Sequence, residues 1–446
     1  MLIPNDVKII LDTFKNNGYE AYIVGGCIRD FIIGSYVPKD YDIATNALPE
    51  EIIKLFDKTV PTGIKHGTVT VMMNGEGFEV TTYRIDGEYL DNRRPELVTF
   101  VLNLKEDLAR RDFTINALAF NEQDGVIDYF NGLEDIENKI IRAVGEPNKR
   151  FQEDALRMLR AIRFAATLDF QIEENTLRAI KMNSNLILNI SSERIRDELC
   201  KMLLSRSSTK AFRLLEGTKL LEYILPELQK AVGFKQLNPH HDKDIFQHTL
   251  AVIENCPESL NLRVAALLHD IAKPDCFTID NKGIGHFYGH DESGVIISEQ
   301  ILRRLKFDND SISKISTLVK EHMNILEKPT DASVKRLINR VGVNLLPDLF
   351  ELQRADALGS RFPEIRLKEI NTVEEKTRDI LQSKVPLSIS ELAVNGGDLM
   401  VEFSLIPGEK IGDMLKFLLD KTLGNPELNS KEKLLSIIFD EYMDNK

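Results

Sequence analysis

Hydrophobic periodicity divides the chain into a mixed α/β region and a helical remainder. Up to about residue 145, the segments 66–73 and 77–85 alternate apolar and polar residues as strands do, and they flank the turn Asn74-Gly75-Glu76-Gly77. The other elements predicted there are strands at 21–24 and 125–130 and a helix at 48–56. This combination predicts a first domain that contains both strands and helices.

From Glu153 onward, apolar residues recur almost throughout at the i, i+3, i+4 spacing of amphipathic helices. The predicted helical segments include 153–168, 174–182, 192–204 and 208–224. Composition changes near residues 237–244, and seven of the eight histidines lie between His240 and His322. After about Pro363 the chain is again helical and ordinary in composition. We therefore predict four domains, at 1–145, 146–235, 236–362 and 363–446.

The segment 22–45 carries the strongest chemical signal. An apolar strand breaks at a Gly-Gly pair, Arg29-Asp30 follows, and a second predicted strand presents Asp40 and Asp42. Residues i and i+2 of a strand point to the same face, so two carboxylates lie beside a glycine turn that phosphates can approach. The alternative is a surface turn with two solvated aspartates. The combined motif favours a Mg²⁺ site for nucleotidyl transfer.

Two further segments carry charged groups suited to a nucleotide. Around residues 110–117, arginines can donate to phosphate oxygens, while Asp112 and Asn116 can bond ribose hydroxyls. In 153–163, the spacing by three predicts that four charged residues lie along one helix flank. These four residues are Asp154, Arg157, Arg160 and Arg163. The alternatives are an exposed ion-pair cluster in the first segment and an i,i+3 salt bridge in the second.

An aspartate and an arginine of this second segment match one base edge. Asp154 can accept from the exocyclic amine of cytosine or adenine, and Arg157 can donate to the adjacent ring nitrogen. Uracil and guanine present a carbonyl where Asp154 needs a donor, so the pair would reject both bases.

Together these motifs resemble those of the class II tRNA nucleotidyltransferases, the CCA-adding enzymes, and of their poly(A) polymerase relatives. The resemblance covers nearly the whole chain and rests on the ordered segments 25–42, 110–120, 128–145 and 153–164. It implies an α+β fold with a polymerase-β-like nucleotidyltransferase head, whose sheet is mixed, followed by an all-α neck, an HD domain and a tail. The partners it implies are the tRNA acceptor end, CTP and ATP.

The resemblance also assigns roles to residues of the head and neck. Asp40 and Asp42 would bind Mg²⁺ ions in a two-metal scheme, and Gly26, Arg29 and Arg111 would contact the nucleotide phosphates and sugar. The neck pair Asp154 and Arg157 would read the base, supported by Arg160 and Arg163. Segment 86–95 resembles the loop present in members that add adenosine. Addition of A alone, and poly(A) synthesis, stay open as alternatives.

The histidine-rich region suggests a second metal site. An adjacent His-Asp pair follows an apolar run, and imidazole with carboxylate suits divalent transition metals. The series resembles an intact HD phosphohydrolase domain, a module found inserted in some CCA-adding enzymes. That resemblance implies His248, His269, Asp270 and Asp356 as primary ligands, with His290 and His322 for a second metal or a phosphate contact. Metal-activated water would attack the phosphorus of cyclic phosphates or RNA ends.

Composition and charge narrow the remaining functions. The net charge of −13 argues against polyanion binding by the whole surface. Residues 142–213 carry a local excess of basic groups that can hold nucleic acid, and the alternative is a helix face of mixed charges exposed to solvent. The four cysteines are scattered, and no apolar run is long enough to span a membrane, so a reducing cytoplasm is expected. The sequence specifies no oligomeric state. A phosphohydrolase whose head merely binds nucleotide and a non-catalytic RNA-binding module are further alternatives, which the intact Asp40/Asp42 pair disfavours.

Overall fold

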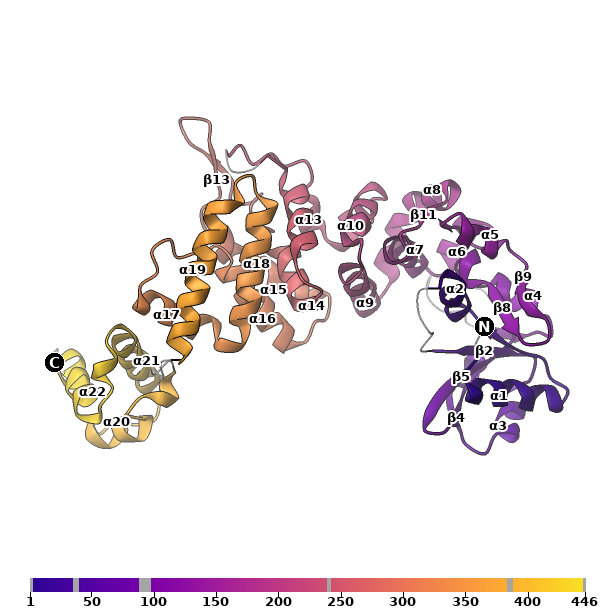
Figure 1. Ribbon diagram of the computed structural model, residues 1–446, viewed down its shortest axis with the longest axis horizontal. Helices are drawn as coiled ribbons and strands as arrows, with labels where there is room; N and C mark the ends of the chain where they lie inside the picture. Colours follow the sequence, from indigo (N-terminus) through magenta and orange to yellow (C-terminus); the bar gives the residue numbers. More distant parts are fainter. Residues whose placement is uncertain (1–2, 35–39, 88–97, 239–241, 383–387, 444–446) are drawn as a thin grey trace. The chain divides into compact units, whose positions relative to one another are not determined.

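The computed structural model describes residues 3–34, 40–87, 98–238, 242–382 and 388–443. The chain forms two compact units, Met1–Gln229 and Lys230–Lys446, hereafter unit 1 and unit 2 (Figure 1). Most of the 86–95 segment that we associate with adenosine addition lies outside the described residues.

A mixed seven-stranded sheet forms the first part of unit 1, in the order β3-β4-β5-β2-β1-β8-β9. Its strands are β1 Ala21–Val24, β2 Asp42–Thr45, β3 Thr59–Gly63, β4 Thr68–Met73, β5 Glu76–Thr82, β8 Leu118–Asn121 and β9 Gly125–Asp128. β2 and β5 are parallel, and every other neighbouring pair is antiparallel. This is the mixed sheet that the resemblance implies.

The predicted hairpin is confirmed, with a tighter turn than expected. Asn74 and Gly75 alone form the turn, at φ 49° and 91°, and Met73 pairs directly with Glu76. Positive φ at both turn residues gives the backbone twist that matches the flanking strands. Glu76 and Gly77, which we placed in the turn, belong to β5.

The predicted strand at the two aspartates begins later than expected. β2 starts at Asp42, so Asp40 lies before the strand rather than in it. Tyr41 between them is buried, whereas Asp40 and Asp42 are both exposed. The alternation of burial that we expected across these three residues is therefore present, although the regular strand is shorter.

Besides two short two-stranded sheets, β6 Arg84–Asp86 with β7 Val98–Phe100 and β10 Ile140–Ile141 with β11 Gln171–Ile172, the rest of unit 1 consists mainly of helices. They are α1 Asn5–Asn16, α2 Gly26–Ile33, α3 Pro49–Leu55, α4 Leu104–Ala109, α5 Gly132–Glu137, α6 Pro147–Glu153, α7 Leu156–Thr167, α8 Glu174–Asn183, α9 Ser192–Leu203, α10 Ser208–Gly217, α11 Leu220–Ile224 and α12 Pro226–Gln229. The predicted segment 208–224 splits into α10 and α11, because Lys219 takes a left-handed conformation with φ 66°. A residue in that conformation ends the hydrogen-bond ladder of a right-handed helix.

The predicted helix at 153–168 is wrong at its start. α6 ends at Glu153, and Asp154 takes an extended conformation, with φ −137° and ψ 103°, before α7 begins at Leu156. The Asp154 carboxylate accepts the Leu156 backbone N–H at 3.1 Å, a local bond that competes with helix continuation. Asp154 therefore lies at a helix junction, and only the three arginines share α7.

Unit 2 is almost entirely helical. Its helices are α13 Ile245–Asn255, α14 Leu260–Leu268, α15 His290–Arg304, α16 Asn309–Glu321, α17 Asp331–Val341, α18 Leu346–Gly359, α19 Pro363–Gln382, α20 Gly396–Glu402, α21 Glu409–Gly424 and α22 Lys431–Ile438. α18 packs against both α13 and α19, and α14 packs against α16 (Figure 1). A short hairpin, β12 Thr278–Ile279 with β13 Gly285–His286, interrupts the helices.

The last helices of unit 2 share a core of their own. Leu399, Met414, Leu418, Leu434 and Ile438 are all fully buried in it. The finer domain boundaries within each unit stay predictions. Across the part of the chain that is described, no helix combines the length and apolarity needed to cross a membrane.

Candidate functional site

The turn between β1 and α2 brings backbone, arginine and carboxylate together in unit 1. Gly25 has φ 87° and ψ −143°, a combination open almost only to glycine. A Cβ atom at this position would lie 3.0 Å from Arg111 Nη1 and 4.0 Å from Asp42 Oδ2. Gly26 then begins α2, whose first N–H groups have no partner within the helix.

Asp42 and Arg111 line a cavity of about 200 Å³ beside this turn. Desolvation raises the pKa of Asp42, the Arg111 guanidinium opposes this shift, and the nearby Asp40 carboxylate adds to it. Two carboxylates that repel one another, one of them partly desolvated, suit a divalent cation, which would remove the repulsion. The donor set of Asp40 and Asp42 thus fits Mg²⁺.

Glu79 is a second carboxylate that lines this cavity with Asp42, and the sequence analysis missed it. Ile43 of β2 pairs with Val80 of β5, so Asp42 and Glu79 precede paired residues on adjacent parallel strands. Phe78 and Val80 are buried while Glu79 is exposed, which turns Glu79 to the same side as Asp42. The alternation of apolar and polar residues in 77–85 indicated that Glu79 is exposed. Only the β2–β5 register shows that Glu79 lies beside Asp42.

Arg110 and Arg111 also line the cavity, and one buried carboxylate holds both. Asp107 is fully buried, with its Oδ1 atom 2.8 Å from Arg110 Nη2 and its Oδ2 atom 3.7 Å from Arg111 Nη2. The two guanidinium groups are therefore restrained on one wall of the cavity. Planar donors held in place suit a polyphosphate.

Arg29, Asp112 and Asn116 form a hydrogen-bonded chain. Arg29 Nη1 donates to Asn116 Oδ1, and Asn116 Nδ2 donates to Asp112 Oδ1 at 3.1 Å. Arg160 donates to the other Asp112 oxygen at 2.6–2.7 Å. Burial alone would raise the pKa of Asp112, but Arg160 and Asn116 lower it to about 2. These predicted nucleotide ligands are thus brought together, and each has protein partners.

The predicted base-reading residues Asp154 and Arg157 do not form the i,i+3 salt bridge with each other; each pairs with a different residue. Arg194 of α9 donates to Asp154 Oδ2 at 2.8 Å and to Oδ1 at 3.4 Å. Arg157 Nη1 instead donates to Glu153 at 2.7 Å, and its Nη2 donates to the Arg110 carbonyl at 2.9 Å. The partner of Asp154 is therefore Arg194, which no spacing in the sequence indicated.

Arg163, the remaining arginine of α7, is bonded to a neighbouring helix. Arg163 Nε donates to Glu198 of α9 at 2.6 Å, and its guanidinium stacks 4.0 Å from the Phe164 ring centroid. Phe164 in turn contacts Phe113 edge to face, at 5.8 Å between centroids. Arg163 therefore joins α7 to α9.

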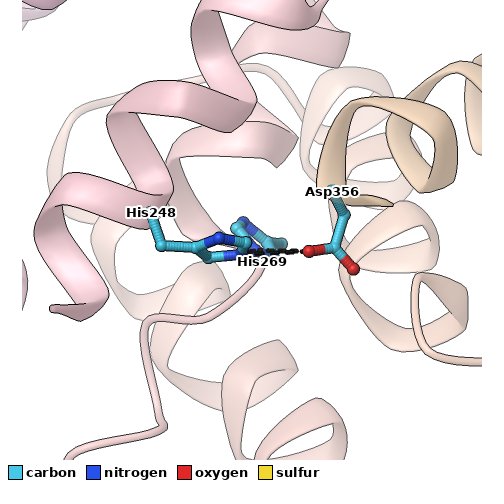
Figure 2. A group of neighbouring side chains, drawn as sticks. All are labelled: His248, His269 and Asp356. Carbon is cyan, nitrogen blue, oxygen red and sulfur yellow. Dashed lines mark hydrogen bonds and ion pairs between the residues drawn. The ribbon is translucent and has the colours of Figure 1, made fainter. Parts of the chain in front are cut away.

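Unit 2 gathers all six ligands predicted for the second metal site into one buried cluster, which we name the HD cluster. Its ligand atoms form two groups, each within 4.8 Å, namely His248, His269 and Asp356, and Asp270, His290 and His322. His248 lies on α13, Asp356 lies on α18, and His269 directly follows α14 (Figure 2). His286, by contrast, pairs with Asp280 at 3.1 Å and joins neither group.

The orientation of the imidazoles fits metal binding. Nδ1 of His269, His290 and His322 lies 2.6–2.8 Å from a backbone carbonyl of the preceding turn, so Nδ1–H donates there and Nε2 keeps its lone pair. Nε2 of His290, Nε2 of His322 and Oδ1 of Asp270 are buried without a hydrogen bond among the described residues, whereas Oδ2 of Asp270 lies 2.7 Å from Lys273 Nζ. Buried polar atoms seldom lack a hydrogen-bond partner, and a divalent cation bound here would coordinate these atoms.

The aspartates of the HD cluster are ionised. Although burial alone would raise it, His269 and Lys273 hold the pKa of Asp270 well below its ordinary value. Burial alone would likewise raise the pKa of Asp356, but the hydrogen bond and charge of His248, together with the charge of His269, hold it well below its ordinary value. Two buried carboxylates among four imidazoles form a ligand set typical of a transition metal.

Three family models match successive parts of the chain. Residues 21–142 match the poly A polymerase head domain, residues 169–232 match "Probable RNA and SrmB- binding site of polymerase A", and residues 296–438 match tRNA nucleotidyltransferase domain 2.

Two relatives that match this chain along nearly its full length are both CCA-adding enzymes. The CCA-adding enzyme of Lactobacillus helveticus is 36% identical over 95% of this chain and 94% of its own length. That of Pediococcus pentosaceus is 36% identical over 97% of both chains. The crystal structure of the Bacillus stearothermophilus CCA-adding enzyme in complex with CTP superposes with a TM-score of 0.72 and 30% identity, covering 100% of this chain and 99% of that one.

Proposed function

This chain belongs to the CCA-adding enzymes, and we propose that the cavity lined by Asp42, Glu79 and Arg111 is where it transfers nucleotides to tRNA. The observation that carries the proposal is the convergence at the Gly25 turn of Asp42, whose carboxylate feels the charge of Asp40, with a restrained arginine. CTP and ATP are the nucleotides, and the tRNA 3′ end is the acceptor. The relative from Bacillus stearothermophilus was solved with CTP, which supports the first substrate.

The charged residues in and around the cavity have definable tasks in this reaction. Asp40 and Asp42 would hold Mg²⁺, which supplies charge stabilisation for the attacking and leaving oxygens. Arg110 and Arg111 bind triphosphate oxygens, and the N–H groups at Gly26 lie where a phosphate can accept from them. Arg29, Asp112 and Asn116 stay predicted nucleotide ligands, and their hydrogen bonds restrain the three side chains.

Base selection is proposed for the junction of α6 and α7. Asp154 accepts from the exocyclic amine that cytosine and adenine share, and Arg157 donates to the adjacent ring nitrogen. Arg160 and Arg163 support this region through Asp112 and Glu198. A cytoplasmic location stays a prediction that follows from the tRNA substrate.

The test uses a tRNA transcript that lacks its 3′ CCA, incubated with Mg²⁺ and CTP, ATP or both. Three additions that require both nucleotides are expected, and Asp42→Asn should slow them by on the order of 100-fold or more. Asp57→Asn, an exposed carboxylate elsewhere in unit 1, is the matched control. A single A added only to transcripts ending in CC, or a long A ladder, would contradict full CCA addition.

We propose a second activity, metal-dependent phosphoester hydrolysis at the HD cluster. It is favoured by the six buried ligands and by the orphaned Nε2 atoms of His290 and His322. Divalent transition-metal ions bound there would activate water and neutralise phosphate charge. The protein's own contribution is to fix the tautomer of each histidine through the backbone carbonyls.

This second activity is separable from the first. Full-length protein loaded with Mn²⁺ or Ni²⁺ should hydrolyse 2′,3′-cyclic AMP or p-nitrophenyl phosphate. His269→Ala should abolish hydrolysis and leave tRNA extension unchanged, while His286→Ala should change neither. Absence of hydrolysis in the metal-loaded wild type would contradict the proposal, and loss of tRNA extension in His269→Ala would contradict the independence of the two sites.

A further inference from the structure

Arg366 is a partly exposed cation next to the buried HD cluster. The six cluster residues are at most 7% exposed, whereas the Arg366 side chain, in the first turn of α19, is 41% exposed. Its Nη1 atom lies 3.5 Å from Asp356 Oδ2. A charged group thus reaches from solvent to a ligand of the buried cluster.

The two oxygens of Asp356 have different partners. Oδ1 lies 3.0 Å from His248 Nε2, on the side where a cation would bind, and Oδ2 faces Arg366. The 3.5 Å separation is longer than the 2.7–2.9 Å typical of an ionic hydrogen bond. Arg366 forms no hydrogen bond to any residue that the structure describes, so its five N–H donors remain available.

Lys273 is the other cation that pairs with a carboxylate of the cluster, and its environment is different. Its Nζ lies 2.7 Å from Asp270 Oδ2, and its side chain is 7% exposed. Nζ also donates to Gln236 and lies over the Phe287 ring. Lys273 is therefore buried and bonded to interior groups, whereas Arg366 is the cation beside the cluster that is accessible to a ligand from solvent.

We propose that Arg366 binds the phosphate group of the ester that the HD cluster hydrolyses. This rests on the hydrolase activity proposed above and assigns its phosphate-binding residue. A guanidinium offers two parallel N–H donors that match two phosphate oxygens. On binding, Arg366 exchanges one long contact with Asp356 for shorter bonds to phosphate, beside the ions that Asp356 and His248 would hold.

The experiment measures phosphate binding apart from catalysis. Mn²⁺-loaded full-length protein is titrated calorimetrically with inorganic phosphate, and Mn²⁺ affinity is measured separately on metal-free protein. Arg366→Gln should weaken phosphate binding by about 10-fold or more, the usual effect of losing a hydrogen bond to a charged group, and leave Mn²⁺ affinity within about 2-fold. Arg366→Lys, which keeps the charge but not the paired donors, should fall between.

The matched control is Arg378→Gln, an exposed arginine on the same helix about 18 Å along its axis. Neither phosphate nor Mn²⁺ binding should change in this variant. The KM for p-nitrophenyl phosphate should rise about as much as the phosphate Kd in Arg366→Gln, with kcat within about 3-fold.

Two results would overturn the assignment while leaving the hydrolase intact. One is an unchanged phosphate Kd in Arg366→Gln, and the other is a loss of Mn²⁺ affinity that accounts for all of the effect, which would make Arg366 a positioning residue for Asp356. If the wild type hydrolyses neither ester when loaded with metal, the hydrolase proposal itself fails, and this inference fails with it.

Discussion

Arg194 and Asp154 form a two-point ion pair that joins α9 to the junction between α6 and α7. The Nη2–Oδ2 distance is 2.8 Å and the Nη1–Oδ1 distance is 3.4 Å, so both carboxylate oxygens face one guanidinium. The pair is partly shielded, with the two side chains 30% and 17% exposed. Arg194 thereby sets the plane of the carboxylate that we propose selects the base.

We expect Arg194→Ala to weaken base discrimination rather than to abolish transfer. Without Arg194, only the Leu156 N–H bond to Oδ1 holds the Asp154 carboxylate, so the hydrogen bond from Oδ2 to a cytosine or adenine amine is less well directed. A loss of about 1–2 kcal/mol in discrimination corresponds to roughly 5–30-fold more UTP or GTP incorporation. Single-nucleotide incorporation on a tRNA transcript measures it.

The matched control for this prediction is Arg196→Ala, on the same helix, whose guanidinium pairs with Asp197 at 2.8 Å. Nucleotide choice should be unchanged in that variant. If Arg194→Ala keeps the wild-type preference for CTP and ATP, then Arg194 does not position Asp154 for base reading.

Glu79 should contribute to transfer from the strand beside Asp42. We expect Glu79→Gln to lower nucleotide incorporation by on the order of 10–100-fold, the range seen when a group that supports a metal site is changed. Glu76→Gln is the control, since Glu76 is an exposed carboxylate of the same strand outside the cavity lining. Equal rates for the two variants would remove Glu79 from the proposed site.

How much of this site the sequence predicts depends on the range of the contacts. Asp40, Asp42 and the Gly25-Gly26 turn lie within one short segment, where local alternation and turn chemistry place them together. The HD cluster was also predicted, although its members span residues 248–356, because the enrichment in histidine and the resemblance to HD domains both indicated it.

Contacts set by register or helix packing were not predictable. Glu79 meets Asp42 only through the parallel β2–β5 pairing, and Arg194 meets Asp154 only because α9 packs on α7. The expected helix flank from Asp154 to Arg163 failed for a related reason. Charge spacing by three is compatible with a continuous helix, but a side-chain bond from Asp154 to the Leu156 N–H ends that continuity.

Asp112 should make the stability of unit 1 depend on pH in the acid range. Its folded pKa of about 2 lies below the ordinary 3.8, because Arg160 and Asn116 outweigh burial. The ionised carboxylate therefore stabilises the fold fully above pH 3.8, and this contribution of about 2 kcal/mol is lost as pH falls through 2. Urea unfolding at a series of pH values measures it.

Comparison with two variants isolates the contribution of Asp112. The difference in unfolding free energy between wild type and Asp112→Asn should be constant above about pH 5 and shrink as pH falls from about 4 to 2. Arg160→Gln should remove most of the same pH dependence, since Arg160 is the main partner. A difference that does not change over this range would show that the ion pair contributes no linked stability.

Gly25→Ala is expected to impair transfer through Arg111. The added Cβ would lie 3.0 Å from Arg111 Nη1, which must then move away from the cavity wall, and the φ of 87° with ψ −143° costs an alanine about 1–3 kcal/mol. Gly34→Ala is the control, because Gly34 also has positive φ, at 74°, but a Cβ atom added there would meet no described atom within 4 Å.

At a temperature where both variants are folded by circular dichroism, Gly25→Ala should show a KM for CTP and ATP raised by about 10-fold, as expected for loss of a charged contact to phosphate. A KM equal to that of Gly34→Ala would mean that Arg111 does not bind the nucleotide from this position.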